Sequence, residues 1–513
     1  MQSSKWLALV ALLSGLCIPL ALAPFNFWPL IFVGVAGFFW LSFRAASARQ
    51  ALWLGWLFGV SQYGLGVSWI YSSMQTVDTP IWLGVLLTAG FCLALALLPL
   101  FQLWFFQRFL RRLPLALMLI APLWWVVNEW VREWLFTGMP WLFAGYALSD
   151  TPMAQNAALF GVYGLSLMVA VISAGMLRVS YRLQRQQRRS AQITALSVVG
   201  LLGLSTLVGL VQPASDWTQA TGTLKVAAIQ SNVDQRRKWT SAQQQPTLDF
   251  YSQVLRDLPD IDLMLWPEAA MTLRPEQIPT YMADLQRLGT ERDMALLTGV
   301  VTQEAGRYYN AILGYGMASG EYRKQHLVPF GEYLPLEKYL RGTIAFFDLP
   351  TSVMYPAAQP QRPIRAELNG QPYFIAPVIC YEATYPDLVR RLARDSDLIA
   401  VISNDAWFGD SIAPHQHLQI TRMRAIENGR DLLRATQNGV SALIDADGRV
   451  LQHSEQFVAA KLTGELSLRT GLTPFQRLPS AFVPWLCLSL LIVLYLMARR
   501  KNRPLAADKP SSL

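Results

Sequence analysis

Cys380 has the clearest chemical potential in this sequence, because it lies in Ile379-Cys380-Tyr381-Glu382 within a polar stretch of the chain. Upstream lie Glu268, in Trp266-Pro267-Glu268, and Lys324. A thiol with a neighbouring base can carry out covalent acyl transfer. The glutamate can take the thiol proton and return it to a leaving group. The lysine can favour the thiolate and bind a developing oxyanion. We therefore predict Glu268, Lys324 and Cys380 to be catalytic.

Each of these three residues also has a plain structural interpretation. Glu268 follows a proline, where a carboxylate often begins a helix. Lys324 adjoins Arg323 and could be a solvated lysine in a basic patch. Cys380 could be an inert buried thiol. Only the combination of the three points to chemistry.

The other potential metal or thiol residues give no comparable signal. Cys17, Cys92 and Cys487 lie in apolar stretches, and no Cys-x-x-Cys spacing occurs. His415-Gln416-His417 contains metal-binding residue types, but positions i and i+2 point apart on a helix. We predict no metal, no disulfide framework and no cofactor.

Composition indicates a protein with an apolar part and a polar part. The chain has 513 residues, 53% hydrophobic and 15% charged, with a net charge of +9. Many arginines occupy short loops between apolar stretches, as in membrane proteins. The polar block, roughly 213–478, shows no basic face with interleaved aromatics, so we predict a lipid bilayer as partner and no nucleic acid.

Eight apolar stretches are long enough, or nearly so, to cross a membrane. They are roughly 6–23, 26–43, 51–71, 81–104, 114–134, 157–177, 192–211 and 480–498. Arginine-rich loops follow stretches two, four, six and eight, whereas the connections after one and three carry no Lys or Arg. Basic loops stay in the cytoplasm. We predict that both termini are cytoplasmic and that the polar block is periplasmic.

The predicted organisation is a seven-helix bundle over 1–212, a catalytic domain over 213–478, and an eighth helix with a cytoplasmic tail over 479–513. Strands are expected at 224–230, 262–266, 295–299, 374–379 and 398–403, with helices at 386–395 and 415–434. Residues 439–451 are typical of two strands around an Asp-Gly turn. This mixture predicts an α/β domain, with Glu268 and Cys380 just after strand ends, where such domains collect ligands.

These residues resemble a known superfamily. The block from about 222 to 470 is similar to the carbon–nitrogen hydrolase (nitrilase) superfamily, which has an αββα sandwich and a Glu-Lys-Cys triad; Glu268, Lys324 and Cys380 match it. The whole chain resembles the membrane-bound branch, the apolipoprotein N-acyltransferases. The segments that match this branch are Arg323–Pro335, Cys380-Tyr381-Glu382, Ser403–Gly409, Pro140–Tyr146 and Gly161–Gly164, whereas Arg424–Arg430 matches the wider superfamily.

The resemblance implies a multi-pass enzyme of the bacterial inner membrane that works in two steps. Cys380 would take an acyl chain from a phospholipid, with phosphatidylethanolamine as the expected donor, and hold it as a thioester. The α-amino group of diacylglyceryl-cysteine in an apolipoprotein would then accept that chain. The catalytic residues would be Glu268, Lys324 and Cys380.

The resemblance also implies supporting residues. Glu332 and Glu382 would orient Lys324 or the amine, and the backbone N–H of Tyr381 would join Lys324 as an oxyanion donor. Trp239 and Trp407 would line the substrate path, unless they are core aromatics. Two other functions remain open: a membrane-tethered amidase with the same triad, and a lipoprotein chaperone with a vestigial domain.

Overall fold

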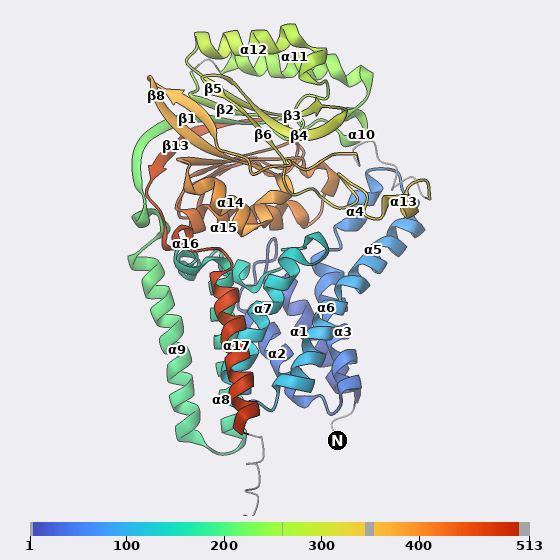
Figure 1. The fold of residues 1–513 in the computed structure, drawn as a ribbon, viewed down its shortest axis with the longest axis vertical. Coiled ribbons are helices and arrows are strands. Elements are labelled where there is room, and N and C mark those ends of the chain that lie inside the picture. The colour runs from blue at the N-terminus through green and yellow to red at the C-terminus, as the bar shows by residue number, and fades with distance from the viewer. Residues whose placement is uncertain (1–3, 259, 344–352, 502–513) are drawn as a thin grey trace, which may run out of the picture.

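The chain folds into a helical part and a sheet part that are stacked on each other (Figure 1). The computed structural model describes residues 4–258, 260–343 and 353–501. The predicted tail beyond residue 501 lies outside these residues. The sheet part is formed by the polar block, and the helical part by the apolar stretches. This agrees with the prediction of apolar helices plus an α/β domain.

The helical part contains the apolar stretches as long helices. They are α1 (Ser4–Leu20), α2 (Leu30–Arg44), α3 (Ala48–Gly66), α5 (Ile81–Leu95), α6 (Leu97–Phe105), α7 (Ala121–Trp134), α8 (Ala157–Gln184), α9 (Arg188–Val211) and α17 (Phe482–Lys501). The short helix α4 (Ile70–Gln75) rises toward the sheet part (Figure 1). Helices α3 and α6 approach closely at Gly55 and Gly59, where a Cβ would lie 2.5 Å from Pro99 O and 2.7 Å from Ala96 Cα, respectively. Such contacts are typical of helices that pack in a membrane.

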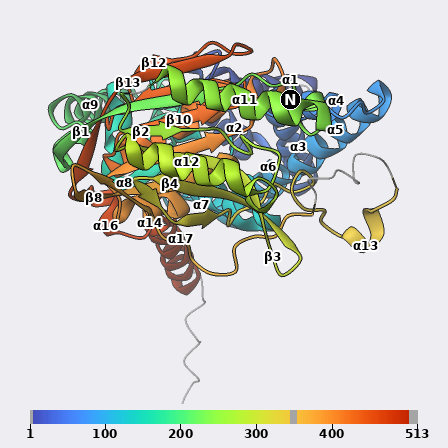
Figure 2. The same cartoon turned by 90° about the horizontal axis from the view of Figure 1, so that it is seen from above.

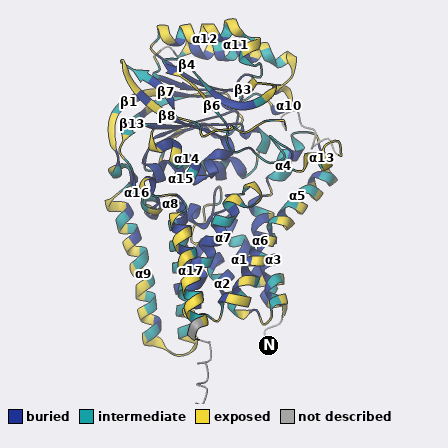
Figure 3. Ribbon diagram, viewed as in Figure 1, coloured by how far each residue is buried: buried dark blue, intermediate teal, exposed yellow. Residues whose placement is uncertain are grey.

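Several of these helices present apolar side chains outward. Among the described residues, four helical segments could cross a membrane by length and composition: Ile81–Leu110, Pro152–Gln184, Arg188–Val211 and Phe482–Arg499. Along α9 and α17 the outer side chains are largely exposed (Figure 3). On α9, for example, Leu196 is 71% exposed and Val211 70%. An apolar surface of this extent indicates that the helices face lipid.

The sheet part contains two sheets. The six-stranded sheet has the order β13 (Ala460–Thr470), β1 (Gln219–Gln230), β2 (Leu263–Leu265), β3 (Ala295–Glu304), β4 (Arg307–Gly316), β6 (Glu321–Arg323). The seven-stranded sheet has the order β12 (Val450–His453), β11 (Ala442–Ile444), β10 (Leu432–Thr436), β9 (Leu398–Ser403), β8 (Gln371–Ile379), β7 (Ile364–Leu368), β5 (Ala318–Ser319). The sheets lie face to face (Figure 1).

Helices cover the outer face of each sheet. Helices α11 (Ser241–Asp257) and α12 (Pro279–Glu291) lie over the six-stranded sheet, as the view from above shows (Figure 2). Helices α14 (Pro386–Arg394) and α15 (Ala413–Asn428) lie between the seven-stranded sheet and the helical part (Figure 1). This is the predicted αββα arrangement, with one sandwich face resting on the helical bundle.

The core follows from alternation along the strands. In β1, Leu224, Val226 and Ala228 belong to the core cluster that runs between the sheets, while Ala227 and Ile229 pack with residues of α11 and α12. Because successive side chains of a strand point to opposite faces, a strand buried on both faces is apolar throughout. This explains why the short apolar runs were recognisable as strands.

One predicted element was wrong. The helix expected at 415–434 ends at Asn428, because Gly429 caps it with φ of +57°. Residues Leu432–Thr436 instead form the buried strand β10, which pairs with β9 and β11. The hairpin expected at 439–451 is confirmed: β11 and β12 are antiparallel around Asp447 and Gly448.

Candidate active site

Cys380 lies at a sharp corner. It directly follows β8 and begins the short turn Cys380–Thr384. Its φ of +52° is in the left-handed region, which a residue with a Cβ occupies at a cost of about 1–3 kcal/mol. Such strain persists only where the surroundings hold it in place. The corner carries the thiol, 8% exposed as a residue, to the end of its sheet.

Glu268 comes from the other sheet. It follows β2, and its neighbourhood is tight, because a Cβ at Gly299 of β3 would lie 2.7 Å from Glu268 Cα. Its Oε1 accepts a hydrogen bond from Asn310 Nδ2 at 2.6 Å, and its Oε2 accepts one from Asn404 N at 2.7 Å. No helix begins at Glu268, so the alternative of a helix-start carboxylate was wrong.

Lys324 follows β6 and joins two carboxylates. Its Nζ lies 3.4 Å from Glu268 Oε1 and 2.8 Å from Glu332 Oε1. Lys324 is 1% exposed, so the alternative of a solvated lysine was wrong. Burial alone would lower the pKa of Lys324, but the charges of Glu332 and Glu268 outweigh it and raise the pKa above its usual value. The side chain is therefore a fixed ammonium.

The Cys380 thiol is in the same electrostatic environment. Burial raises the pKa of Cys380 above its usual value, and Glu268 raises it further, whereas Lys324 lowers it. Lys324 therefore lowers the pKa of the thiol, as expected from the sequence, but burial and Glu268 together raise it by more. A thiol with a raised pKa is protonated at neutral pH, so it needs a base during attack on a carbonyl. Glu268 is the carboxylate that acts on it most strongly.

Glu332 belongs to the same polar cluster. Its Oε1 contacts Lys324 and accepts a hydrogen bond from Asn310 Nδ2 at 2.9 Å, and its Oε2 accepts one from Val328 N at 2.8 Å. Glu332 therefore tethers the loop after Lys324 to the ammonium. Of the two supporting glutamates expected from the sequence, this one contacts the predicted triad directly.

Glu382 has a different place. Its carboxylate accepts hydrogen bonds from Tyr322 Oη at 2.9 Å, Ile379 N at 2.9 Å, Gln325 N at 2.6 Å and His326 N at 3.2 Å. It is fully buried, and burial raises the pKa of Glu382 to about 7. These bonds fasten the Cys380 turn to the segment that follows Lys324. Glu382 therefore contacts the backbone next to Lys324 and not the Lys324 side chain.

The three expected aromatic residues differ in their surroundings. Tyr381 is buried, and its hydroxyl donates to Gly138 O at 3.1 Å, so the nucleophile turn is joined to the helical part. Trp239 is 40% exposed and Trp407 is partly exposed, so neither is a core aromatic. Trp239 follows Lys238, whose Nζ donates to Glu268 O at 3.2 Å.

Sequence reasoning missed four residues around the triad: Lys238, Asn310, Asn404 and His417. Lys238 is buried and forms no ion pair with the described residues, and burial lowers its pKa to about 7 although the charge of Glu268 opposes this shift. Asn310 is a polar residue inside an apolar strand, and Lys238 is part of a basic run. The position of Asn310 was a usable signal, because a polar side chain inside a buried strand needs a hydrogen-bond partner.

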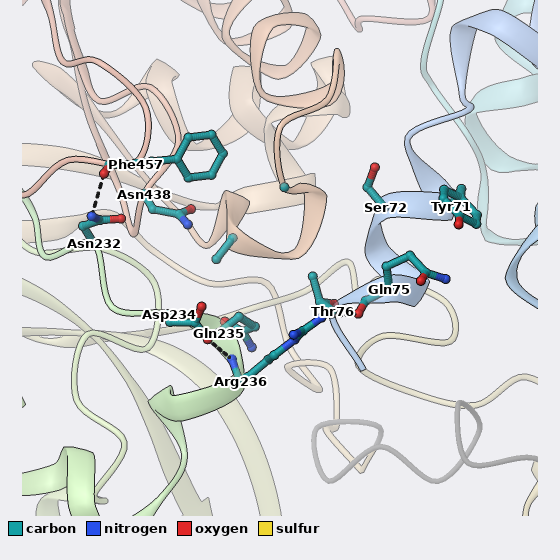
Figure 4. A pocket seen from close by; sticks show the side chains of 12 residues that line it. Tyr71, Ser72, Gln75, Thr76, Asn232, Asp234, Gln235, Arg236, Asn438 and Phe457 are labelled. Carbon is teal, nitrogen blue, oxygen red and sulfur yellow. Dashed lines mark hydrogen bonds between the residues drawn. The ribbon is translucent and has the colours of Figure 1, made fainter. Parts of the chain in front are cut away.

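A cavity of about 510 Å³ lies between the sheet part and α4 (Figure 4). Its wall includes Gln75 of α4 on one side and Gln235 and Asn438 on the other. Gln235 Oε1 accepts a hydrogen bond from Asn404 Nδ2 at 2.9 Å, and the backbone N–H of Asn404 donates to Glu268. Two hydrogen bonds through Asn404 therefore link Gln235, in the wall of the cavity, to Glu268.

Comparisons with known proteins cover both parts of the chain. Residues 14–175 match the family described as apolipoprotein N-acyltransferase N-terminal domain, and residues 225–470 match the carbon-nitrogen hydrolase family. Similar curated proteins carry the name apolipoprotein N-acyltransferase, among them the following three. The protein of Azotobacter vinelandii is 44% identical over 91% of both chains. That of Pseudomonas putida is 42% identical over 91% of this chain and 92% of its own, and that of Pseudomonas paraeruginosa is 40% identical over 97% and 96%.

Proposed function

This chain belongs to the apolipoprotein N-acyltransferase family, and from this premise we propose that it moves an acyl chain from a phospholipid to the α-amino group of diacylglyceryl-cysteine in apolipoproteins. The observation that carries the mechanism is the buried Glu268–Lys324 pair, 3.4 Å apart, beside the strained Cys380 turn. This cluster lies in a domain that rests directly on apolar helices, so both substrates can stay in lipid (Figure 1).

In the first step Cys380 Sγ attacks the ester carbonyl of the phospholipid while Glu268 takes the thiol proton. The carbonyl oxygen gains negative charge, and Lys324 Nζ and the backbone N–H of Tyr381 stabilise it. One such donor typically lowers the activation barrier by about 3–4 kcal/mol. The carbon–oxygen bond then breaks, Glu268 returns its proton to the departing lysophospholipid oxygen, and a thioester remains on Cys380.

In the second step the α-amino group of the acceptor attacks the thioester carbonyl. The same two donors hold the oxyanion, and Glu268 takes a proton from the amine. When the carbon–sulfur bond breaks, Glu268 returns this proton to the thiolate of Cys380 and an amide is formed. The two substrates use one site in turn, which is a ping-pong sequence through an acyl-enzyme.

The contact between the nucleophile turn and the helical part favours lipid substrates over a small soluble amide. Tyr381 Oη donates to Gly138 O, and Tyr385 Oη donates to Thr137 O at 2.8 Å. The catalytic turn is therefore fixed to a loop of the apolar part. An amidase for small amides would have no use for this attachment. The intact set of Glu268, Lys324 and Cys380 also argues against a chaperone with a vestigial domain.

The positions of the basic loops support the topology expected from the sequence. Arg111 Nη1 donates to Ala45 O at 2.8 Å, which brings two of those loops together. The α8–α9 turn, also arginine-rich, lies at the end of the bundle opposite the sheets (Figure 1). We propose a bundle of residues 1–212, a periplasmic catalytic domain of residues 213–478 and an eighth helix within residues 479–513, with both chain termini in the cytoplasm and an inner-membrane location.

An assay of products tests the function. The purified chain in liposomes would receive a diacylated lipopeptide and one phospholipid at a time, with phosphatidylethanolamine as the proposed donor. We expect lysophospholipid and N-acylated lipopeptide in equal amounts. Free fatty acid without N-acylated peptide would indicate a hydrolase. Equal rates with all headgroups would refute the proposed donor preference but not the transfer.

A further inference from the structure

His417 lies buried behind the nucleophile, on α15. Its Nε2 is 3.0 Å from the backbone oxygen of Cys380. Its Nδ1 is 3.1 Å from Arg434 Nη2 and 3.3 Å from Asp405 Oδ1. Arg434 and Asp405 are themselves joined at 2.8 Å, and all three side chains are buried. The proposed mechanism leaves this cluster without a role.

The contacts determine where the imidazole proton sits. Arginine can only donate hydrogen bonds, so Nδ1 of His417 accepts from Arg434. Asp405 does not need a proton from the imidazole, because Arg434 and the Ser403 hydroxyl, at 2.6 Å, already donate to its carboxylate. Burial lowers the pKa of His417, and Arg434 lowers it further. The imidazole is therefore neutral, with its proton on Nε2, and it donates to Cys380 O.

That carbonyl belongs to the same rigid unit as a proposed oxyanion donor. The peptide bond between Cys380 and Tyr381 is planar and trans, so its C=O and N–H point in opposite directions. A hydrogen bond that fixes the Cys380 oxygen also fixes the direction of the Tyr381 N–H. The same bond polarises the peptide and strengthens the N–H as a donor. The strained φ of Cys380 makes such an outside restraint necessary.

We propose that His417 is a positioning residue for acyl transfer: its Nε2–H holds the Cys380 carbonyl and thereby aims the Tyr381 N–H at the oxyanion. Arg434 fixes the tautomer by donating to Nδ1, and Asp405 balances the charge of Arg434. The inference rests on the proposed function for its reaction. Its test uses an activated ester, so it does not depend on which lipid is the natural donor.

The test compares His417→Leu, which lacks a donor, with His417→Gln, whose amide offers both a donor and an acceptor. His415→Leu and His415→Gln on the same helix are the matched controls. The background protein has Cys17, Cys92 and Cys487 changed to Ala, so that only Cys380 reacts. Two rates are measured for each variant: acylation by p-nitrophenyl octanoate at saturation, and alkylation by iodoacetamide. Alkylation uses the thiol but creates no oxyanion.

We expect His417→Leu to acylate about 10- to 100-fold more slowly, somewhat less than the full loss of an oxyanion donor, with its ester KM and alkylation rate unchanged. His417→Gln should recover most of the acylation rate, and both His415 variants should match the background. Acylation of His417→Leu at the background rate would overturn the inference. So would a parallel fall of acylation and alkylation, or a His417→Gln as slow as His417→Leu.

A second measurement uses the parent protein, so it does not depend on the folding of a His417 variant. Nitrogen-15 NMR of the histidine-labelled parent in liposomes reports the tautomer of each of its four histidines. His417 should show the Nε2–H tautomer and should not titrate between about pH 5 and 8, the range in which an ordinary histidine does. An Nδ1–H tautomer, or an imidazolium in that range, would contradict the inference. If phospholipids fail as donors, the proposed function is wrong, while both of these readouts still decide the role of His417.

Discussion

Asn310 Nδ2, on strand β4 of the same sheet, lies 2.6 Å from Glu268 Oε1 and donates a hydrogen bond to that carboxylate. The same nitrogen lies 2.9 Å from Glu332 Oε1. One amide therefore joins the two carboxylates that flank Lys324. Glu268 and Glu332 place two negative charges beside the buried ammonium of Lys324. Because residue 310 is neutral, it adds no third negative charge to this cluster. The identity of this side chain should thus control the ionisation of the proposed base.

Asn310→Asp should nearly abolish thioester formation. The new carboxylate would face Glu268 and Glu332 at hydrogen-bond distance, and like charges so close cannot all ionise. If Glu268 shares the extra proton, it can no longer act as the base. General-base catalysis typically contributes about 10²–10⁴-fold to the rate. Asn369→Asp is the matched control, because it adds the same charge in the exposed turn between β7 and β8. Equal acylation rates for the two variants would show that Asn310 has no such role.

Glu332→Gln should slow both the formation of the thioester and its discharge, because Lys324 serves as an oxyanion donor in both steps. Glu332 contacts Lys324 directly, so removing its charge disturbs the oxyanion donor that thioester formation requires. We expect the acyl adduct to appear at least tenfold more slowly with phospholipid, because a weakened oxyanion donor stabilises the transition state less. Glu382→Gln should instead lower the melting temperature, because its carboxylate holds backbone N–H groups. A Glu332→Gln protein that acylates normally and fails only to discharge onto lipopeptide would assign Glu332 to the amine.

Alkylation of Cys380 should increase with pH well past neutrality. Its pKa is held above the usual value, so in the Cys380-only protein the thiolate fraction, and the iodoacetamide rate, should rise about tenfold per unit between about pH 7 and 9. A free cysteine peptide would begin to level off near pH 9. Lys324→Met should react more slowly than its parent throughout, because Lys324 lowers the thiol pKa. A plateau below pH 8 would mean a preformed thiolate and would remove the need for Glu268.

The membrane topology gives a prediction independent of catalysis. A reporter that is active only in the periplasm should be active when fused after about residue 215 and inactive when fused after about residue 186. The α8–α9 turn carries arginines at 182, 185, 188 and 189, and basic loops of this kind are expected to stay in the cytoplasm. The reverse pattern would put the catalytic block in the cytoplasm and exclude an acceptor in the outer leaflet.

The residues of the proposed triad could be selected from the sequence because they stand in short, contiguous patterns. Trp266-Pro267-Glu268 and Ile379-Cys380-Tyr381 each follow an apolar strand, so their positions at strand ends followed from local pattern alone. That the two strands belong to different sheets did not follow. It depends on strand order, with β2 in the six-stranded sheet and β8 in the seven-stranded sheet.

The residues that support the triad could not be found in this way. Asn310 and His417 are 42 and 37 positions from the residues they contact, and only the packing of two sheets and α15 brings them together. The end of α15 was misjudged for a related reason. Leu432 and Leu433 continue an apolar pattern that suits a helix, but Gly429 adopts a left-handed conformation and the next residues pair with β9.

The most direct test of the account is the intact mass of the purified protein after incubation with phosphatidylethanolamine and no acceptor. We predict a hydroxylamine-labile increase of one fatty acyl group on the parent protein and on Cys17→Ala, Cys92→Ala and Cys487→Ala. The increase should be absent from Cys380→Ala, and it should disappear from the parent when a diacylated lipopeptide is added. An acyl adduct on Cys380→Ala, or N-acylation of the lipopeptide by that variant, would contradict the assignment of Cys380 as the nucleophile.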